Sequence, residues 1–185
     1  MTHVPKRLRD LAKQLNLHII AHVPETVYQY DPDDRVLRSD NVSGLVHELA
    51  HYLVAEPKER TLPNFGYDHG PDGGLRSHNH FPPGKDDDIR EEQASLLGIY
   101  IERALGLRCT PKNSWISDRI HTRHWKSDGS VPMHMLTFRD HCWTHGLAKT
   151  TATALHAKGL LVRRPDGSFY PAVLPPRRDG RAAQS

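Results

Sequence analysis

The residues with the clearest chemical potential in this sequence are His47, Glu48 and His51, in the run His-Glu-Leu-Ala-His. Residues four apart in an α-helix lie on one face, about 6 Å apart, so both imidazoles can reach the same metal ion. The glutamate lies at the edge of such a site, where a carboxylate can take a proton from water. The spacing predicts His47 and His51 as metal ligands and Glu48 as the catalytic acid/base residue. The alternative is an exposed polar group on a helix surface.

The surrounding residues predict the helix that this motif needs. Ser39-Asp40-Asn41 supplies polar side chains that can cap a helix start. Glu56-Pro57 ends it, because the residue before a proline resists the α conformation. Between them, apolar residues recur at helical spacing and give the helix a buried face: Val42, Leu45, Val46, Leu49, Leu53 and Val54.

A second predicted helix, residues 89–107, offers a third metal ligand. Glu91 is followed at helical spacing by small residues, which let two helices approach closely: Ala94, Ser95 and Gly98. This Glu-x-x-Ala pattern resembles the third-ligand helix of the glutamate-type zincins, the broad His-Glu-x-x-His peptidase superfamily. Glu92 is the alternative ligand, since helix neighbours differ by about 100° and only one of the two can face the metal. We favour Glu91; a solvated glutamate in the first turn, favoured by the helix dipole, is the other interpretation.

Composition predicts a single soluble domain in the cytoplasm. A chain of 185 residues with 25% charged residues can bury a core without disulfides. Its two cysteines, Cys109 and Cys142, form no disulfide framework, which favours a reducing compartment. Apolar runs are too short to span a membrane, and a net charge of +3 is too small to indicate nucleic-acid binding. We expect one metal-binding domain over residues 1–174 and a disordered basic tail over residues 175–185.

The order of elements predicts an α+β, zincin-like fold, with a small antiparallel sheet packed on helices. Residues 4–15 read as a helix, and residues 17–23 and 27–30 as extended segments. A turn at residues 31–34 leads into a strand at residues 35–38, and the helix with the two histidines follows.

A long irregular segment, residues 57–88, separates the two predicted metal-site helices. A loop of that length within a compact domain is usually functional or disordered, and its aromatic and histidine residues argue against disorder. Five of its residues are candidates to line the open side of the metal: Tyr67, His69, Arg76, His78 and His80. We expect the tyrosine and the three histidines among them to bind substrate. One of them could stabilise an oxyanion.

The helix and this loop together resemble a specific family, the bacterial elongation factor P hydroxylases. The resemblance covers roughly residues 40–110, and it rests on the motif His47–Tyr52 together with residues of the following loop: Ala55, Arg60, Leu62, Phe65-Gly66-Tyr67 and Pro71-Asp72-Gly73. It implies a zincin-like metalloenzyme that hydroxylates a lysine side chain of a translation factor.

Two histidines and a carboxylate with open positions suit either of two metals. Zinc would make the protein a hydrolase of a peptide or amide bond, with a protein or peptide as substrate; this is the interpretation we favour. Fe²⁺ would make it a non-haem hydroxylase. A third alternative is a non-catalytic binding protein whose metal only stabilises a surface.

The C-terminal third is less informative. His141, Cys142 and His145 have the spacing of a second metal site, although surface or capping histidines explain them more simply. Residues 133–161 look mainly helical with a break near Gly146, and a Pro-Asp-Gly hairpin follows. A helix leading into a basic hairpin faintly resembles a winged helix, but nucleic-acid binding is the weaker interpretation.

Overall fold

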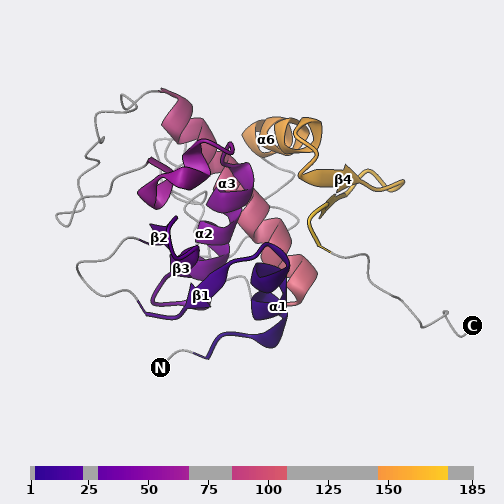
Figure 1. The fold of residues 1–185 in the computed structure, drawn as a ribbon. Coiled ribbons are helices and arrows are strands. Elements are labelled where there is room, and N and C mark those ends of the chain that lie inside the picture. The colour runs from indigo at the N-terminus through magenta and orange to yellow at the C-terminus, as the bar shows by residue number, and fades with distance from the viewer. Residues whose placement is uncertain (1–2, 23–28, 67–84, 108–145, 175–185) are drawn as a thin grey trace, which may run out of the picture.

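The computed structural model describes residues 3–22, 29–66, 85–107 and 146–174. For residues 85–88, 91, 92 and 146–148 it describes the backbone and not the side chains. It is a mixed α+β fold (Figure 1). Its elements are α1 Lys6–Gln14, β1 His18–Ile20, β2 Tyr30–Asp31, β3 Val36–Arg38, α2 Val42–Val54, the short 3₁₀ segments Glu59–Thr61 and Pro63–Gly66, α3 Lys85–Leu105, α6 Gly146–Ala157, β4 Leu161–Arg163 and β5 Phe169–Pro171.

The N-terminal sheet is mixed rather than antiparallel, which corrects the prediction from sequence. Its strand order is β1-β3-β2, with β2 antiparallel and β1 parallel to the central β3. The β2–β3 pair is a hairpin, and its turn is held by Asp31, whose Oδ1 accepts from the backbone N of Asp33 at 3.1 Å. β1 is not tied to β3 by a tight turn, so nothing in the connection forces it to be antiparallel.

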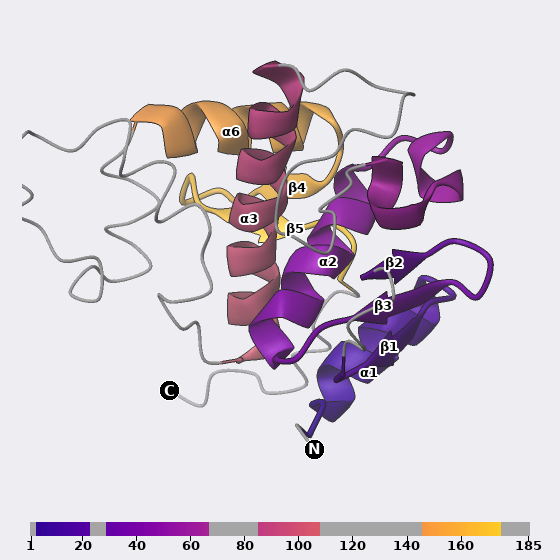
Figure 2. The same ribbon diagram turned by 90° about the vertical axis from the view of Figure 1, so that its left-hand side faces the viewer.

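The elements form successive layers (Figure 2). The three-stranded sheet lies between α1 and α2, and α3 packs on the side of α2 away from the sheet. α6 and the β4–β5 hairpin cover α3 in turn. α2 is therefore the central helix of the described structure, covered on two sides.

Local sequence explains where α2 begins and where α3 begins and ends. Asn41 caps α2, with its Oδ1 accepting from Gly44 N at 2.7 Å. α3 begins at Lys85, about one turn before its predicted start, where an acidic run favours a helix N-terminus. It ends at Leu105, and the φ of +66° at Gly106 then lets the Leu107 N–H reach the Glu102 carbonyl at 2.8 Å.

One hydrophobic core joins these layers. Its most deeply buried large side chains come from α1, the sheet, α2, α3 and α6: Leu8, Leu11, Tyr30, Leu37, Leu45, Leu49, Leu96, Leu97, Ile101 and Leu155. Within the described ranges, no helix combines the length and apolar character needed to cross a bilayer.

The C-terminal part confirms the predicted hairpin. β4 and β5 pair antiparallel, and Gly167 has the positive φ of +83° that the Pro-Asp-Gly turn requires. α6 begins at the predicted break, Gly146. The rest of the helical stretch expected from residue 133 and the tail 175–185 lie outside the described residues.

Candidate functional site

His47 and His51 stand one turn apart in α2 and direct the same ring nitrogen at each other. Their Nε2 atoms are 2.9 Å apart, and the rings are perpendicular, with centroids 4.5 Å apart. Two nitrogens at this distance either share one proton or bind one cation. With metal–nitrogen bonds of about 2.0–2.1 Å, two nitrogen ligands of one ion lie about 2.9 Å apart at a right angle and about 3.4 Å apart at the tetrahedral angle. The pair is therefore close to the spacing of two ligands of one transition-metal ion, and a tetrahedral ion would move the two rings slightly apart.

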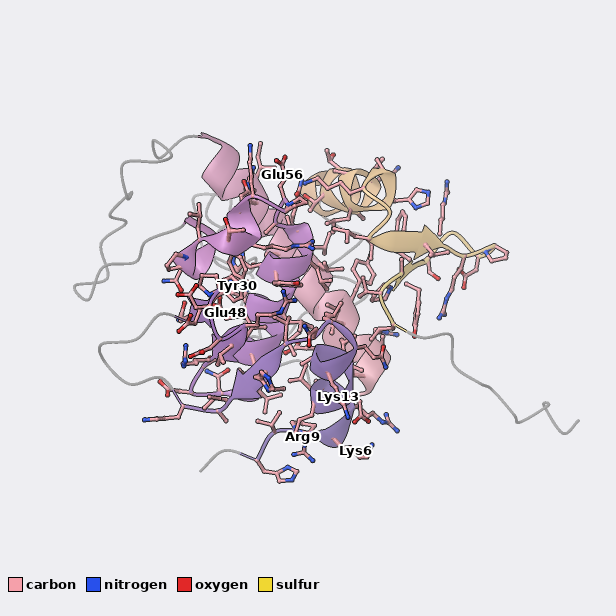
Figure 3. All side chains as sticks on the ribbon, viewed as in Figure 1. Lys6, Arg9, Lys13, Tyr30, Glu48 and Glu56 are labelled. Atoms are coloured by element: carbon pink, nitrogen blue, oxygen red, sulfur yellow. The ribbon has the colours of Figure 1, made fainter. Side chains whose placement is uncertain are left out.

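Glu48 lies in the same turn of α2 and is also enclosed by protein. Glu48 is only 8% exposed, and His51 is 7% exposed. Glu48 is labelled in Figure 3. An exposed polar face would leave these side chains in water. Burial of Glu48 and His51 in the centre of the fold therefore argues against the simplest alternative to a functional site.

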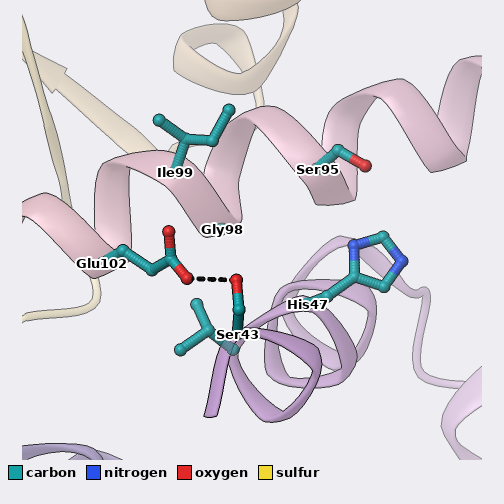
Figure 4. A pocket seen from close by; sticks show the side chains of 7 residues that line it. Ser43, His47, Ser95, Gly98, Ile99 and Glu102 are labelled. Atoms are coloured by element: carbon teal, nitrogen blue, oxygen red, sulfur yellow. Dashed lines mark hydrogen bonds between the residues drawn. The ribbon is translucent and has the colours of Figure 1, made fainter. Parts of the chain in front are cut away.

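α3 lies close against the histidine helix, in the opposite direction. The Ser43 hydroxyl, near the start of α2, donates to Glu102, near the end of α3. A Cβ atom on Gly98 would lie 3.8–3.9 Å from Val46, Ala50 and the His47 Cα. Of the small residues predicted from sequence to permit a close approach, Gly98 lies at this contact and Ser95 lies beside it (Figure 4).

The predicted third ligand, Glu91, belongs to the first half of α3 together with its alternative, Glu92; the structure describes their backbone and not their side chains. Their neighbour Arg90 is fixed by an ion pair with Glu59. Glu59 in turn accepts from the Glu56 N–H at 2.8 Å, just after α2. Among the described side chains, no group of three or more His, Cys, Asp or Glu is placed to hold a metal.

Three aromatic rings, those of Tyr30, Tyr52 and Phe65, pack together beside His51 and form an aromatic wall. The Phe65 ring stacks on Tyr30, with centroids 4.3 Å apart and planes 8° apart, and lies 6.0 Å from the His51 ring. Phe65 and Asn64 have φ of 59° and 45°, in the left-handed region that residues with a Cβ rarely occupy. Asn64 is held there by a bond from the Tyr30 N–H to its Oδ1, at 2.9 Å.

Burial within this aromatic wall changes the pKa of the Tyr30 hydroxyl. Tyr30 is 1% exposed, and its hydroxyl donates to the Arg60 carbonyl at 2.8 Å. Burial raises the pKa of Tyr30 above its ordinary value, and the nearby Tyr52 adds to the rise, while Arg35 and Arg60 oppose it. The Arg60 guanidinium lies over the Tyr52 ring, 4.6 Å from its centroid.

Other candidate residues lie outside the described part of the chain. These are the predicted substrate-binding residues Tyr67, His69, His78 and His80, and the possible second metal cluster His141, Cys142 and His145.

Sequence reasoning missed two side chains near His47, those of Ser43 and Glu102. Both were available from periodicity, because Ser43 is four residues before His47 and Glu102 is eleven after Glu91. Phe65 was named only as part of the loop that carries the family resemblance, and neither its left-handed backbone nor its contact with His51 has a signal in the sequence.

No protein-family model, curated protein or solved structure matches this chain.

Proposed function

We propose that this protein is a zinc-dependent hydrolase of peptide or amide bonds, with a zincin-like arrangement of its metal helix and ligands. The observation that carries the proposal is the convergence of the His47 and His51 Nε2 atoms at 2.9 Å in a buried helix. Neutral imidazole nitrogens are ligands that zinc prefers, and two of them on one helical turn leave positions open for a carboxylate and for substrate.

We assign the third ligand to Glu91. On a helix, residues 91, 95, 98 and 102 fall within about 60° of one another, so they share one face. Three of them, Ser95, Gly98 and Glu102, lie against α2 beside His47. Glu91 occupies the same face one turn beyond Ser95, in the direction in which α2 runs from His47 to His51. Glu92 lies about 100° away from that face.

Glu48 is the acid/base residue in this proposal. When bound, zinc supplies Lewis acidity, which polarises a carbonyl and acidifies water. Glu48 takes the proton from the attacking water and delivers it to the nitrogen of the leaving amine. His47 and His51 hold their side of the site rigid, since both belong to a helix covered on two sides.

The test compares Glu48→Gln with Glu56→Gln, which removes an exposed carboxylate just after α2. Zinc-loaded proteins are incubated with a mixed peptide library, and cleavage is followed by mass spectrometry. We expect Glu48→Gln to keep its zinc and lose about 10²–10⁴-fold in cleavage rate, as removal of a general base does. Glu56→Gln should behave as wild type. Cleavage at the wild-type rate by Glu48→Gln would overturn the assignment.

One observation favours the second candidate, an iron hydroxylase of a protein lysine side chain. Phe65 belongs to the loop that resembles the elongation factor P hydroxylases, and its ring lies against His51. The same ligands suit Fe²⁺ and oxygen chemistry. This candidate predicts oxygen consumption by the iron-loaded protein and a substrate heavier by one oxygen atom. Peptide cleavage by the zinc form, without either result, would exclude it.

A further inference from the structure

Positive charge is concentrated in the segment that forms α6 and the β4–β5 hairpin. Residues 1–145 contain 18 basic and 20 acidic residues, whereas residues 146–174 contain four basic residues and one acidic residue. A net charge of +3 for the whole chain conceals this separation. All four basic residues of the segment are exposed: Lys149, Lys158, Arg163 and Arg164. Charge asymmetry between two parts of a chain indicates that the basic part meets a polyanion.

Two of these cations meet at the hairpin tip, residues 163–168. Arg163 pairs with Phe169 in the β4–β5 register, and a Cβ atom on Gly167 would lie 3.9 Å from Arg163 Nη2. The Arg164 guanidinium lies over the Tyr170 ring, 4.9 Å from its centroid. Because Phe169 and Tyr170 are neighbours in one strand, they belong to opposite faces of the hairpin. The two guanidinium groups therefore flank the tip from both of its faces.

The described fold leaves the hydrogen-bond donors of both arginines unused. Within the described part of the chain, neither guanidinium donates a hydrogen bond or forms an ion pair. The one acidic residue of the tip, Asp166, is held by the turn, since its Oδ1 accepts from the Ser168 backbone N at 2.9 Å and from the Ser168 hydroxyl at 2.6 Å. Each arginine thus offers five N–H donors to a ligand.

The hairpin tip is both projecting and preorganised. Figure 1 shows the turn extending away from α6 and α3. Backbone bonds close it, from Arg164 N to the Ser168 carbonyl at 2.7 Å and from Gly167 N to the Arg164 carbonyl at 2.9 Å. A narrow two-stranded ribbon of this kind fits a groove of a double-stranded nucleic acid, where phosphates line both walls.

We propose that the hairpin tip binds the phosphate backbone of a nucleic acid through Arg163 and Arg164. The planar guanidinium group recognises phosphate oxygens with two parallel hydrogen bonds, which lysine cannot do. A membrane surface fits less well, because Val162 is the one large apolar side chain exposed among those described in this segment. A protein partner would need about 800 Å² of surface, far more than a projecting turn offers. The binding needs no metal and is separate from the proposed hydrolase site.

The test is fluorescence anisotropy with this protein and labelled nucleic acids of about 20 nucleotides per strand, a DNA duplex and a single-stranded RNA, at about 0.1 M salt. We expect a dissociation constant of about 10⁻⁶–10⁻⁴ M. One phosphate contact contributes about −0.9 to the slope of log K against log salt, which amounts to about eightfold in affinity at 0.1 M salt relative to 1 M. Arg163→Gln and Arg164→Gln should therefore each weaken binding about eightfold and reduce the slope by about one.

Lys13→Gln is the matched control, because it removes one exposed positive charge from α1 (Figure 3). It should keep wild-type affinity, and all three variants should unfold at the same urea concentration as wild type, because the substituted side chains are exposed. A higher affinity for the duplex or for the RNA identifies which nucleic acid the tip prefers, provided that the two arginine variants weaken it.

Three results would overturn the proposal. The first is no binding of either nucleic acid by the wild type. The second is unchanged affinity in both arginine variants, or an equal loss in Lys13→Gln, because the effect would then be one of overall charge. The third is tighter binding to polyglutamate or to phosphatidylserine vesicles than to either nucleic acid, which would assign the tip to an acidic protein or to a membrane surface.

Discussion

Replacing Phe65 with leucine tests whether the aromatic wall both stabilises the fold and supports His51. The substitution removes the ring contacts to Tyr30 at 4.3 Å, to His51 at 6.0 Å and to Tyr52 at 6.5 Å. Each aromatic pair contributes about 0.5–1.5 kcal/mol beyond buried area, so the three together amount to about 1.5–4.5 kcal/mol. Leucine also has a Cβ, so the cost of the left-handed backbone stays the same in both proteins and does not enter the difference.

The assay is urea unfolding of the metal-free protein, followed by zinc affinity. Phe169→Leu is the control, because the Phe169 ring also packs against other rings, those of Tyr100 at 6.5 Å and His156 at 5.9 Å, far from His51 in sequence. We expect both variants to lose stability and only Phe65→Leu to bind zinc more weakly. A free energy of unfolding for Phe65→Leu within about 0.5 kcal/mol of wild type would refute the reasoning. Equal zinc loss in both variants would refute the link to His51.

Three further predictions concern helix contact and titration. Gly98→Ala should raise the free energy of unfolding, measured in urea, by up to about 1 kcal/mol, because its new Cβ meets nothing closer than 3.8 Å. Gly44→Ala should instead lower the free energy of unfolding by about 1–3 kcal/mol, because its Cβ would lie 2.0 Å from the Ser39 hydroxyl oxygen. Because the pKa of Tyr30 is raised in the folded protein, its contribution to the free energy of unfolding is complete below the unfolded pKa of about 10 and is lost as pH rises above that value. Tyr30→Phe should remove this loss of stability at high pH, measured by urea unfolding at a series of pH values. Hydrogen bonds from Ser168 lower the pKa of Asp166, so the charged form favours the folded turn above the unfolded pKa and this contribution is lost as pH falls; Ser168→Ala should bring the NMR-measured pKa of Asp166 back up.

The helices could be predicted from the sequence because capping residues and the spacing of apolar residues are local features of the chain. Asn41 offers a capping oxygen three residues before the backbone N–H that it accepts from, and the apolar residues that follow repeat at helical spacing. The small residues of α3 likewise predicted a close helix contact, and Gly98 provides it.

The sheet and the aromatic wall depend on contacts that sequence spacing does not encode. β1 pairs in parallel with β3, along the edge of β3 that β2 does not occupy. The spacing of apolar residues in β1 fixes neither that edge nor that direction. Phe65 adopts a left-handed backbone because its ring stacks on Tyr30 and its neighbour Asn64 bonds the same residue, across more than thirty positions of sequence. Tertiary packing overrides local preference there.

The metal content of this protein tests the central claim most directly. Protein purified without an affinity metal and without oxygen, and its His47→Ala variant prepared in parallel, are analysed by elemental mass spectrometry. We predict about one equivalent of zinc in the wild type and its loss in His47→Ala, because two imidazoles on one helical turn hold the ion together. Iron in place of zinc would favour the hydroxylase. No metal in the wild type, or equal metal in both proteins, would contradict a metal site at His47 and His51.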